Sequence, residues 1–142
     1  MINLSIEQLK QLPVFGIAGN FAEHLSQAGE EADFIHVKTA EANAPKGIFP
    51  VYLPQYSGFV GTFPLSHTHI AVDFSAPINL HMEPEMCVLF DVSYADKQVA
   101  SLQAVALSAF NDCSIRKPNA KKISEKKNWG ASCTGVARQW LE

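Results

Sequence analysis

The chain has 142 residues, of which 47% are hydrophobic and 18% are charged, and its formal net charge is -3. This length suits one ordinary domain, and the hydrophobic content excludes a chain that is disordered throughout. The negative charge argues against a dedicated nucleic-acid-binding domain, and no apolar run approaches the roughly 20 residues of a membrane-spanning helix. We therefore expect a single domain over residues 1–142, with neither a nucleic-acid partner nor a membrane span.

The N-terminus and the cysteines indicate the compartment. The opening stretch, MINLSIEQLKQL, has no basic segment ahead of an apolar one, so we expect no signal peptide. The cysteines, Cys87, Cys113 and Cys133, are odd in number and form no CxxC pair, which favours reduced thiols over a disulfide framework. Both features are typical of a cytoplasmic protein.

Short elements are predicted for the N-terminal part of the chain. Ser5 can cap a short helix that ends before the first proline. Residues 14–20 predict a brief apolar strand broken by glycines, and residues 21–28 predict a short helix. Residues 33–38 alternate in side-chain polarity, which indicates a strand that leads into a loop over residues 40–47.

The middle of the chain predicts a sheet that is rolled or sandwiched. Residues 48–90 form a series of short strand-like pieces separated by prolines and glycines. Residues 99–109 fit a helix or a helix that leads into a strand, and periodicity does not decide between them. A basic segment then runs from Arg116 to Lys127. We expect one or two of its lysines to face a substrate and the others to face solvent.

Two carboxylates stand two residues apart at positions 83 and 85. If this segment is a strand, alternate residues share a face, so His81, Glu83 and Glu85 point the same way. The residues expected to pack behind them are Leu80, Met82 and Met86. Carboxylates spaced about 7 Å apart need a cation or a proton between them, and hard oxygen ligands favour Mg²⁺, Mn²⁺ or Ca²⁺. The alternative is an exposed acidic edge, protected from pairing by Pro84.

An acid and an arginine follow the next apolar stretch. Asp112 is placed to complete a site of three carboxylates. Arg116 is placed to bind an anionic substrate through a two-pronged hydrogen bond. The alternative is a turn with a surface arginine.

Three histidines are candidates for chemistry. His67 and His69 share the face of a predicted strand and could bind zinc, but no third and fourth ligands accompany them at suitable spacing. His24 follows a glycine turn on a predicted helix, where a general base could face a cleft. The alternative for His24 is a polar surface position.

Taken in chain order, five segments resemble motifs of the fumarylacetoacetate hydrolase superfamily. Residues 19–24, GNFAEH, look like its Asn-aromatic-x-x-His segment, and residues 34–38, FIHVK, look like its strand that ends in a lysine. Residues 83–85, EPE, are similar to its Glu-x-Glu metal motif. Residues 111–116, NDCSIR, are similar to its Asn-Asp-x-Ser-x-Arg motif, and Lys126 is similar to the lysine that follows.

This resemblance implies an α+β, mainly β fold: a mixed β-roll or sandwich with few short helices. It also implies a homodimer that binds Mg²⁺ or Mn²⁺ and acts on a small anionic keto acid. By this resemblance the metal ligands are Glu83, Glu85 and Asp112. The other roles that it implies are His24 as general base, Lys126 as stabiliser of an enolate or oxyanion, and Arg116 and Lys38 as substrate-binding residues.

The sequence departs from the family pattern at several places, which include residues 134–136, TGV, where the family has Leu-Gly-Pro. Gln27 stands where the family often has a glutamate, and residues 127–130, KNWG, replace an aromatic stretch. The family domain continues with further strands beyond the position of Glu142, so this sequence corresponds either to a fragment of that domain or to a roll that is completed in another way. We expect a divalent-metal-dependent enzyme that acts on a keto or diketo acid by carbon-carbon bond hydrolysis, decarboxylation or keto-enol isomerisation. The alternative is a binding or structural domain that retains the fold but not turnover.

Overall fold

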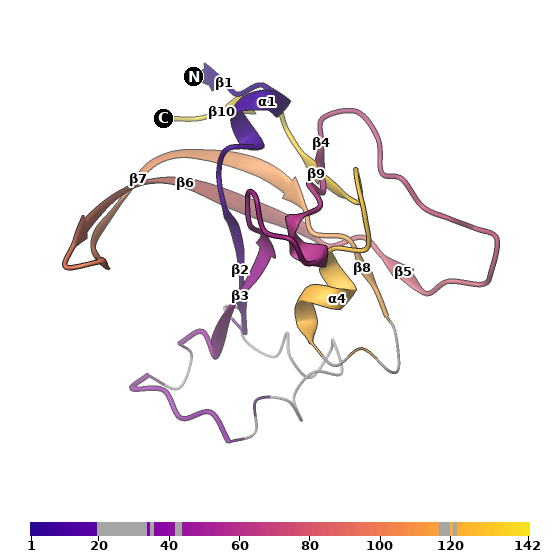
Figure 1. The fold of residues 1–142 in the computed structure, drawn as a ribbon, viewed down its shortest axis with the longest axis horizontal. Helices are drawn as coiled ribbons and strands as arrows, with labels where there is room; N and C mark the ends of the chain where they lie inside the picture. The colour runs from indigo at the N-terminus through magenta and orange to yellow at the C-terminus, as the bar shows by residue number, and fades with distance from the viewer. Residues whose placement is uncertain (20–33, 35, 42–43, 117–119, 121) are drawn as a thin grey trace.

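The computed structural model describes residues 1–19, 34, 36–41, 44–116, 120 and 122–142. Within them the chain is mainly β with few short helices (Figure 1), which confirms the coarse fold class expected from the sequence. The elements are β1 (Ile2–Asn3), α1 (Ile6–Leu9), β2 (Val14–Ala18), β3 (Gly47–Tyr52), the 3-10 helix η1 (Phe59–Gly61), β4 (Leu65–Ser66), β5 (Leu80–His81), β6 (Pro84–Ala95), β7 (Gln98–Asn111), β8 (Ser114–Ile115), α4 (Ile123–Lys127), β9 (Thr134–Val136) and β10 (Gln139–Trp140). In these residues we find no helix whose length and apolar character would let it cross a bilayer.

The largest sheet has four strands in the order β4-β9-β7-β6. Its central feature is the long antiparallel pair of β6 and β7, whereas β4 and β9 run parallel. The strands β1 and β10, β2 and β3, and β5 and β8 form antiparallel pairs outside this sheet. Because β1 pairs with β10, the two termini lie side by side (Figure 1).

The hydrophobic core lies on one face of the β6-β7 pair. Its buried members come from α1, β4, β7, β9 and β10: Leu9, Leu65, Ala106, Val136 and Trp140. Cys87 and Leu89 of β6 pack against this cluster. Because alternate residues of a strand point to opposite faces, the intervening residues of β6 are turned away from the core.

Helix α1 covers one end of this core. Its N-cap, Ser5, accepts a hydrogen bond on Oγ from the Gln8 N–H at 3.2 Å, and the Ser5 N–H donates to the Gln8 side chain at 2.9 Å. This reciprocal pair satisfies two backbone donors that a helix start leaves without partners. The capped helix predicted after Ser5 is therefore confirmed, and its Leu9 is buried.

The segment of residues 33–38 is not a strand where the structure describes it. The Val37 N–H donates to the Phe34 carbonyl at 2.9 Å, which closes a turn, and Lys38 is exposed. Alternation misleads here because a strand also needs a pairing partner and a face to bury. The helix predicted for residues 21–28 lies outside the described residues.

The segment of residues 99–109, in contrast, is strand throughout. It lies within β7, which pairs with β6 from Gln98 to Asn111. Pairing with a distant strand outweighs the local helical tendency. Helix α4 was not predicted, because its N-cap, Lys122, makes no side-chain capping bond and its sequence ISEKK has little apolar periodicity.

His67 ties the N-terminal segment to the four-stranded sheet. Its Nδ1 lies 2.9 Å from the Val136 carbonyl oxygen, and its Nε2 lies 3.0 Å from the Leu4 carbonyl oxygen. Carbonyl oxygens only accept, so any hydrogen bond here is donated by the ring. His69 is exposed and contacts the hydroxyl of its neighbour Thr68. The described contacts thus give His67 a role in holding backbone segments together.

His67→Ala should lower the free energy of unfolding by about 1–3 kcal/mol, because a backbone carbonyl that accepts a hydrogen bond from the ring, that of Leu4 or that of Val136, loses its donor. His69→Ala is the matched control and should change it by less than about 0.5 kcal/mol, because that side chain is exposed. Urea unfolding followed by circular dichroism measures both values. Equal effects of the two substitutions would contradict the role given to His67.

Candidate functional site

A group of charged side chains, which we call the charge cluster, gathers at the base of the β6-β7 pair. Its members are Glu83, Asp112, Arg116 and Lys127. Glu83 precedes β6, Asp112 follows β7, Arg116 follows β8, and Lys127 ends α4. These side chains are between 7% and 16% exposed, so most of the cluster is removed from water.

Strand pairing holds the two carboxylates of the cluster close together. Pro84 lies opposite Asn111 at the end of the β6-β7 pair. One residue further on, the Asp112 N–H donates to the Glu83 carbonyl at 2.9 Å. The β5-β8 pair continues in the same register beyond this point. Glu83 and Asp112 are therefore neighbours across the two strands, although they are far apart in the sequence.

Glu83 is hydrogen-bonded on both carboxylate oxygens. Its Oε1 accepts from the Ser114 hydroxyl and from Nη2 of Arg116 at 2.9 Å, and its Oε2 accepts from Nζ of Lys127 at 2.7 Å. Burial by itself would raise the pKa of Glu83. The hydrogen bonds from Lys127 and Ser114 and the nearby positive charges instead hold this pKa below its ordinary value of 4.5. Glu83 is therefore ionised at neutral pH.

Lys127 lies between the two carboxylates. Its Nζ is 2.8 Å from Oδ2 of Asp112 and 2.7 Å from Oε2 of Glu83, and it also donates to the Asp112 carbonyl at 3.3 Å. Burial by itself would lower the pKa of Lys127, but the charges and hydrogen bonds of Asp112 and Glu83 raise it above its ordinary value of 10.5. With Arg116, two positive charges balance two negative ones in the cluster.

Several residues predicted from the sequence meet here: Glu83, Asp112 and Arg116 belong to the cluster. Glu85 lies in β6, partly buried opposite Phe110. Glu83 and Glu85 are both partly buried whereas Pro84 and Met86 are exposed, which agrees with the alternation predicted for this segment. The lysine that bridges the carboxylates is Lys127, the neighbour of the predicted Lys126.

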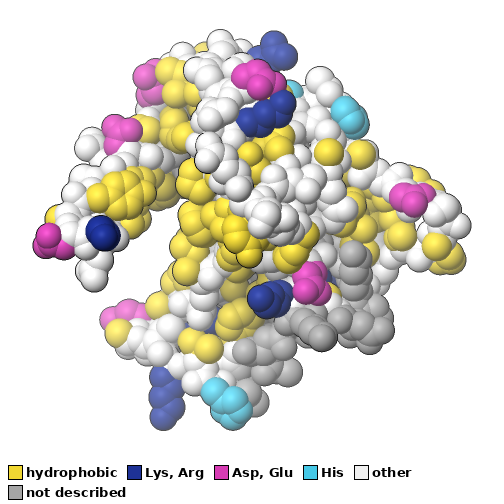
Figure 2. All heavy atoms as spheres, viewed as in Figure 1, with side chains coloured by type: hydrophobic (Ala, Val, Ile, Leu, Met, Phe, Trp, Pro, Cys, Tyr) yellow, Lys and Arg dark blue, Asp and Glu magenta, His cyan; other side chains and the backbone are white. Residues whose placement is uncertain are grey.

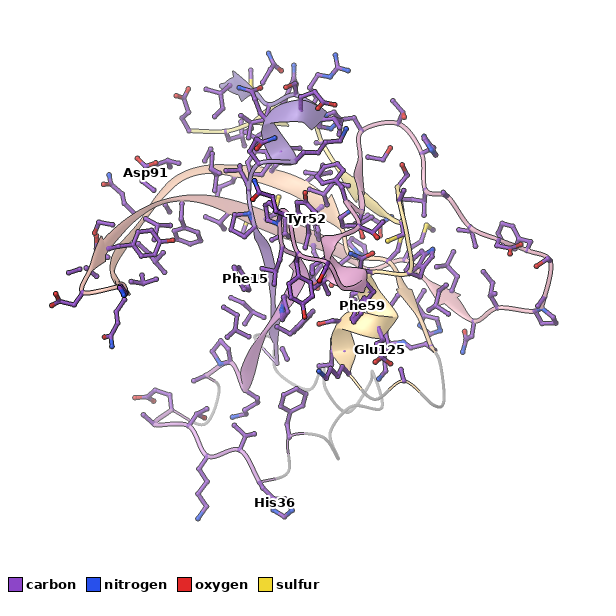
Figure 3. All side chains as sticks on the ribbon, viewed as in Figure 1. Phe15, His36, Tyr52, Phe59, Asp91 and Glu125 are labelled. Atoms are coloured by element: carbon purple, nitrogen blue, oxygen red, sulfur yellow. The ribbon has the colours of Figure 1, made fainter. Side chains whose placement is uncertain are left out.

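The remaining predicted residues lie elsewhere or outside the described chain. Lys126 is partly buried on α4. Lys38 is exposed in a stretch without regular structure, just after His36, which projects at the lower edge of the molecule (Figure 3). His24 lies outside the described residues, so its predicted role as general base stays a prediction.

Sequence reasoning missed Lys127 and Ser114. Helix α4 buries Ser124 and Lys127, which stand three positions apart and so share a face of the helix. That spacing is the signal that could have favoured Lys127 over Lys126, but it is visible only once the segment is known to be a helix. Ser114 stands between Asp112 and Arg116 in the predicted motif, where its hydroxyl had no assigned partner.

The donor set of the cluster can be tested for a divalent cation. Glu83 and Asp112 direct oxygens at one cationic atom, Nζ of Lys127, so two hard donors already converge on one positive charge. Carboxylate oxygens are ligands that Mg²⁺ and Mn²⁺ prefer. No group of three His, Cys, Asp or Glu side chains within the described residues is arranged to hold a metal ion. The two carboxylates are thus of the ligand type that such a cation prefers, but in the described residues they converge on the Lys127 ammonium, with which a cation would have to compete.

A cavity of about 510 Å³ lies beside the start of α4. Its lining is mostly apolar and includes Phe49, Phe59, Ile123 and Ser124. Figure 3 shows Phe59 beside α4. Pockets that bind small molecules span about 300–1,000 Å³, so the volume suits a small ligand. The cavity and the charge cluster lie on successive turns of the same helix, because Ser124 lines one and Lys127 belongs to the other.

The cysteines do not offer a reactive thiolate. Cys113 and Cys133 are fully buried, and burial raises the pKa of both thiols. Burial likewise raises the pKa of Cys87, to about 11. The thiolate is the nucleophilic form of cysteine, so these protonated thiols are poor nucleophiles at neutral pH. Chemistry at this site therefore falls to its carboxylates and cations.

Comparison with known proteins gives one match. Residues 30–142 match a family described as a family of unknown function, DUF5718. No curated protein and no solved structure matches the chain. The matched range includes every member of the charge cluster and begins after α1 and β2.

Lys127→Met should lower the free energy of unfolding by about 3–5 kcal/mol, because it leaves two buried carboxylates with one cation fewer. Lys126→Met is the matched control on the adjacent position, and its more accessible side chain should make the loss smaller than about 1 kcal/mol. Denaturant unfolding of both variants gives the comparison. A larger loss for Lys126→Met than for Lys127→Met would show that the wrong lysine has been assigned to the cluster.

Proposed function

The chain belongs to DUF5718, a family of unknown function, and we propose that it is an enzyme that acts on a small anionic keto or diketo acid at the charge cluster. The observation that carries this proposal is the meeting of Glu83, Asp112 and Arg116 with a lysine in one mostly buried site. These residues come from segments up to 44 positions apart. Titratable groups with perturbed pKa values that converge in this way are candidates for catalysis.

Glu83 and Asp112 would hold Mg²⁺ or Mn²⁺, with Glu85 as the third ligand expected from the sequence. The lowered pKa of Glu83 keeps its carboxylate ionised, which metal binding requires. When bound, the cation would supply a Lewis acid that polarises a keto oxygen. Lys127 would then have to give up part of its contact with the two carboxylates.

The cations of the cluster would bind and stabilise the substrate. Arg116 would bind the carboxylate of the substrate through charge-assisted hydrogen bonds with the guanidinium, whose planar geometry matches a carboxylate. The raised pKa of Lys127 keeps its ammonium protonated, so it would stabilise negative charge on an enolate or oxyanion. This is the role that the resemblance implies for Lys126. His24 as general base and Lys38 as a second substrate-binding residue remain part of the proposal.

The apolar cavity beside α4 would receive the uncharged end of the substrate. It shares the helix that carries Lys127, and its lining brings aromatic side chains such as Phe49 and Phe59. Pockets of this kind bury most of a small ligand and leave orientation to a few polar groups. We include in the proposal a mixed β-roll of the fumarylacetoacetate hydrolase type and a cytoplasmic location.

A second candidate function is that of a binding or structural domain without turnover. The observation that favours it is the internal balance of the charge cluster, in which Lys127 makes three contacts with Glu83 and Asp112. An ammonium has three donors, so these contacts can use all of them. Buried charged groups that are paired in this way can serve to hold segments of a fold together.

Calorimetric titration with Mn²⁺ and Mg²⁺, followed by a screen of keto and diketo acids, tests the enzyme proposal. We expect saturable binding to the wild-type protein. Glu83→Gln and Asp112→Asn should each weaken the binding of the cation by tenfold or more. Even substitution of residues that only support metal ligands lowers metal affinity by about 10–100-fold. Asp91→Asn, which removes an exposed carboxylate from β6, is the control and should bind as the wild type does.

The two candidate functions give different results in this experiment. Metal-dependent turnover of a keto acid that is lost with Glu83→Gln supports the enzyme. A folded wild-type protein that neither binds a divalent cation nor turns over any keto acid contradicts it and leaves the binding or structural domain.

A further inference from the structure

The strands β6 and β7 extend beyond the rest of the sheet as a two-stranded arm. Strand β9 pairs with β7 only at Phe110 and Asn111, and an isolated bridge joins Leu107 to the C-terminal segment. Residues 90–104, which form the outer part of both strands and the turn between them, are all exposed. Figure 1 shows this arm curving away from the other elements.

The arm has one apolar face and one polar face. Strand register places Val92 opposite Leu102, and Tyr94 opposite Val99. The intervening positions are polar: Ser93 pairs with Ser101, and their hydroxyls lie 2.6 Å apart. Alternate residues of β6 share a face, and residues paired across the two strands lie on the same face, so the apolar side chains gather on one side of the arm. Register shifts between Leu89 and Phe90 and between Ser93 and Tyr94 keep the apolar residues of β7 on this face, although their spacing along β7 is odd. Asp91, on the polar face, points away from the hollow side of the arm (Figure 3).

The apolar face continues to the base of the arm. Met86 alternates with Cys87, so it points away from the core that Cys87 contacts, and it is exposed. The sequence-based expectation that Met82 and Met86 pack behind the carboxylates is therefore wrong, because the core lies on the opposite face. Together these side chains form what we call the apolar stripe: Met86, Phe90, Val92, Tyr94, Val99, Leu102 and Leu107. Figure 2 shows hydrophobic atoms along the arm.

The size of the apolar stripe is that of one side of a dimer interface. Its members are between 38% and 69% exposed. With about 150–250 Å² for each large side chain, they present roughly 700 Å² of accessible surface. The largest apolar patch on a typical monomer is about 300–600 Å², whereas each partner in a standard interface buries about 800 Å². A two-stranded ribbon is also marginally stable alone in water, so the arm gains from being covered.

We propose that the apolar stripe binds the same stripe of a second copy of this chain, so that two arms pack face to face across a two-fold axis. The stripe contains no charged residue, so two identical faces can meet without burying like charges. The charges of the arm lie on its other face, as Asp91 does, or at its turn, which holds Asp96 and Lys97. In the described sheet β6 is also the last strand, so its outer edge is open to a neighbour. This proposal does not depend on the charge cluster.

Sedimentation velocity of the whole chain over a range of concentrations tests the proposal. We expect the wild type to be a dimer. Leu102→Glu places a charge in the middle of the stripe and should raise the dimer dissociation constant at least 100-fold. Gln103→Glu adds the same charge one residue away on the polar face, and should leave the dimer intact. Leu102 is exposed within one copy, so the substitution should leave its fold unchanged, as circular dichroism can verify.

Either of two results would overturn the proposal: a wild-type protein that stays monomeric at every soluble concentration, or a folded Leu102→Glu protein that dimerises as the wild type does. If Leu102→Glu fails to fold, Tyr94→Glu provides the same test at the most exposed position of the stripe. Dissociation by Tyr94→Glu supports the proposal, and an unchanged dimer overturns it.

Discussion

The buried ammonium of Lys127 compensates the two carboxylates that meet at the base of the β6-β7 pair. Its Nζ lies 2.7 Å from Glu83 and 2.8 Å from Asp112. Strand register brings these two carboxylates together, because the Asp112 N–H donates to the Glu83 carbonyl. Two negative charges held so close in a mostly buried place need a cation or a proton between them. The Lys127 ammonium supplies the cation and so stabilises this part of the fold, whether or not the site also turns over a substrate.

Helix α4, which ends at this lysine, is also anchored to β3 by the residues on either side of Lys127. One turn before it, Ser124 Oγ donates to the Pro50 carbonyl at 2.6 Å, and one residue after it, Asn128 Nδ2 donates to the Val51 carbonyl at 2.8 Å. Both acceptors belong to β3. Helix α4 thus links the β2-β3 pair to the charge cluster, and the apolar cavity beside α4 lies along this link. Helix α4 therefore contributes both the lysine that compensates Glu83 and Asp112 and part of the lining of the cavity.

Sequence patterns predicted the features that depend on nearby residues. The helix capped by Ser5 and the alternating burial around Glu83 and Glu85 follow from local spacing, and the structure has both. The strand at residues 99–109, and the fact that Lys127 and not Lys126 contacts the carboxylates, depend on pairing and packing between distant segments. A local sequence pattern does not contain this information. Alternation also predicted two faces for β6 but not which face meets the core, and this is why Met86 was wrongly expected to be covered.

A double-mutant cycle between Glu83→Gln and Lys127→Met measures the interaction between the buried carboxylate of Glu83 and the ammonium of Lys127. Urea unfolding of the wild type, the two single variants and the double variant gives the coupling free energy between the two side chains. If the ammonium compensates the buried carboxylate, the double variant should be less destabilised than the sum of the single variants by about 1–3 kcal/mol. Effects that add within about 0.5 kcal/mol would contradict the claim that Lys127 and Glu83 stabilise the fold as a pair.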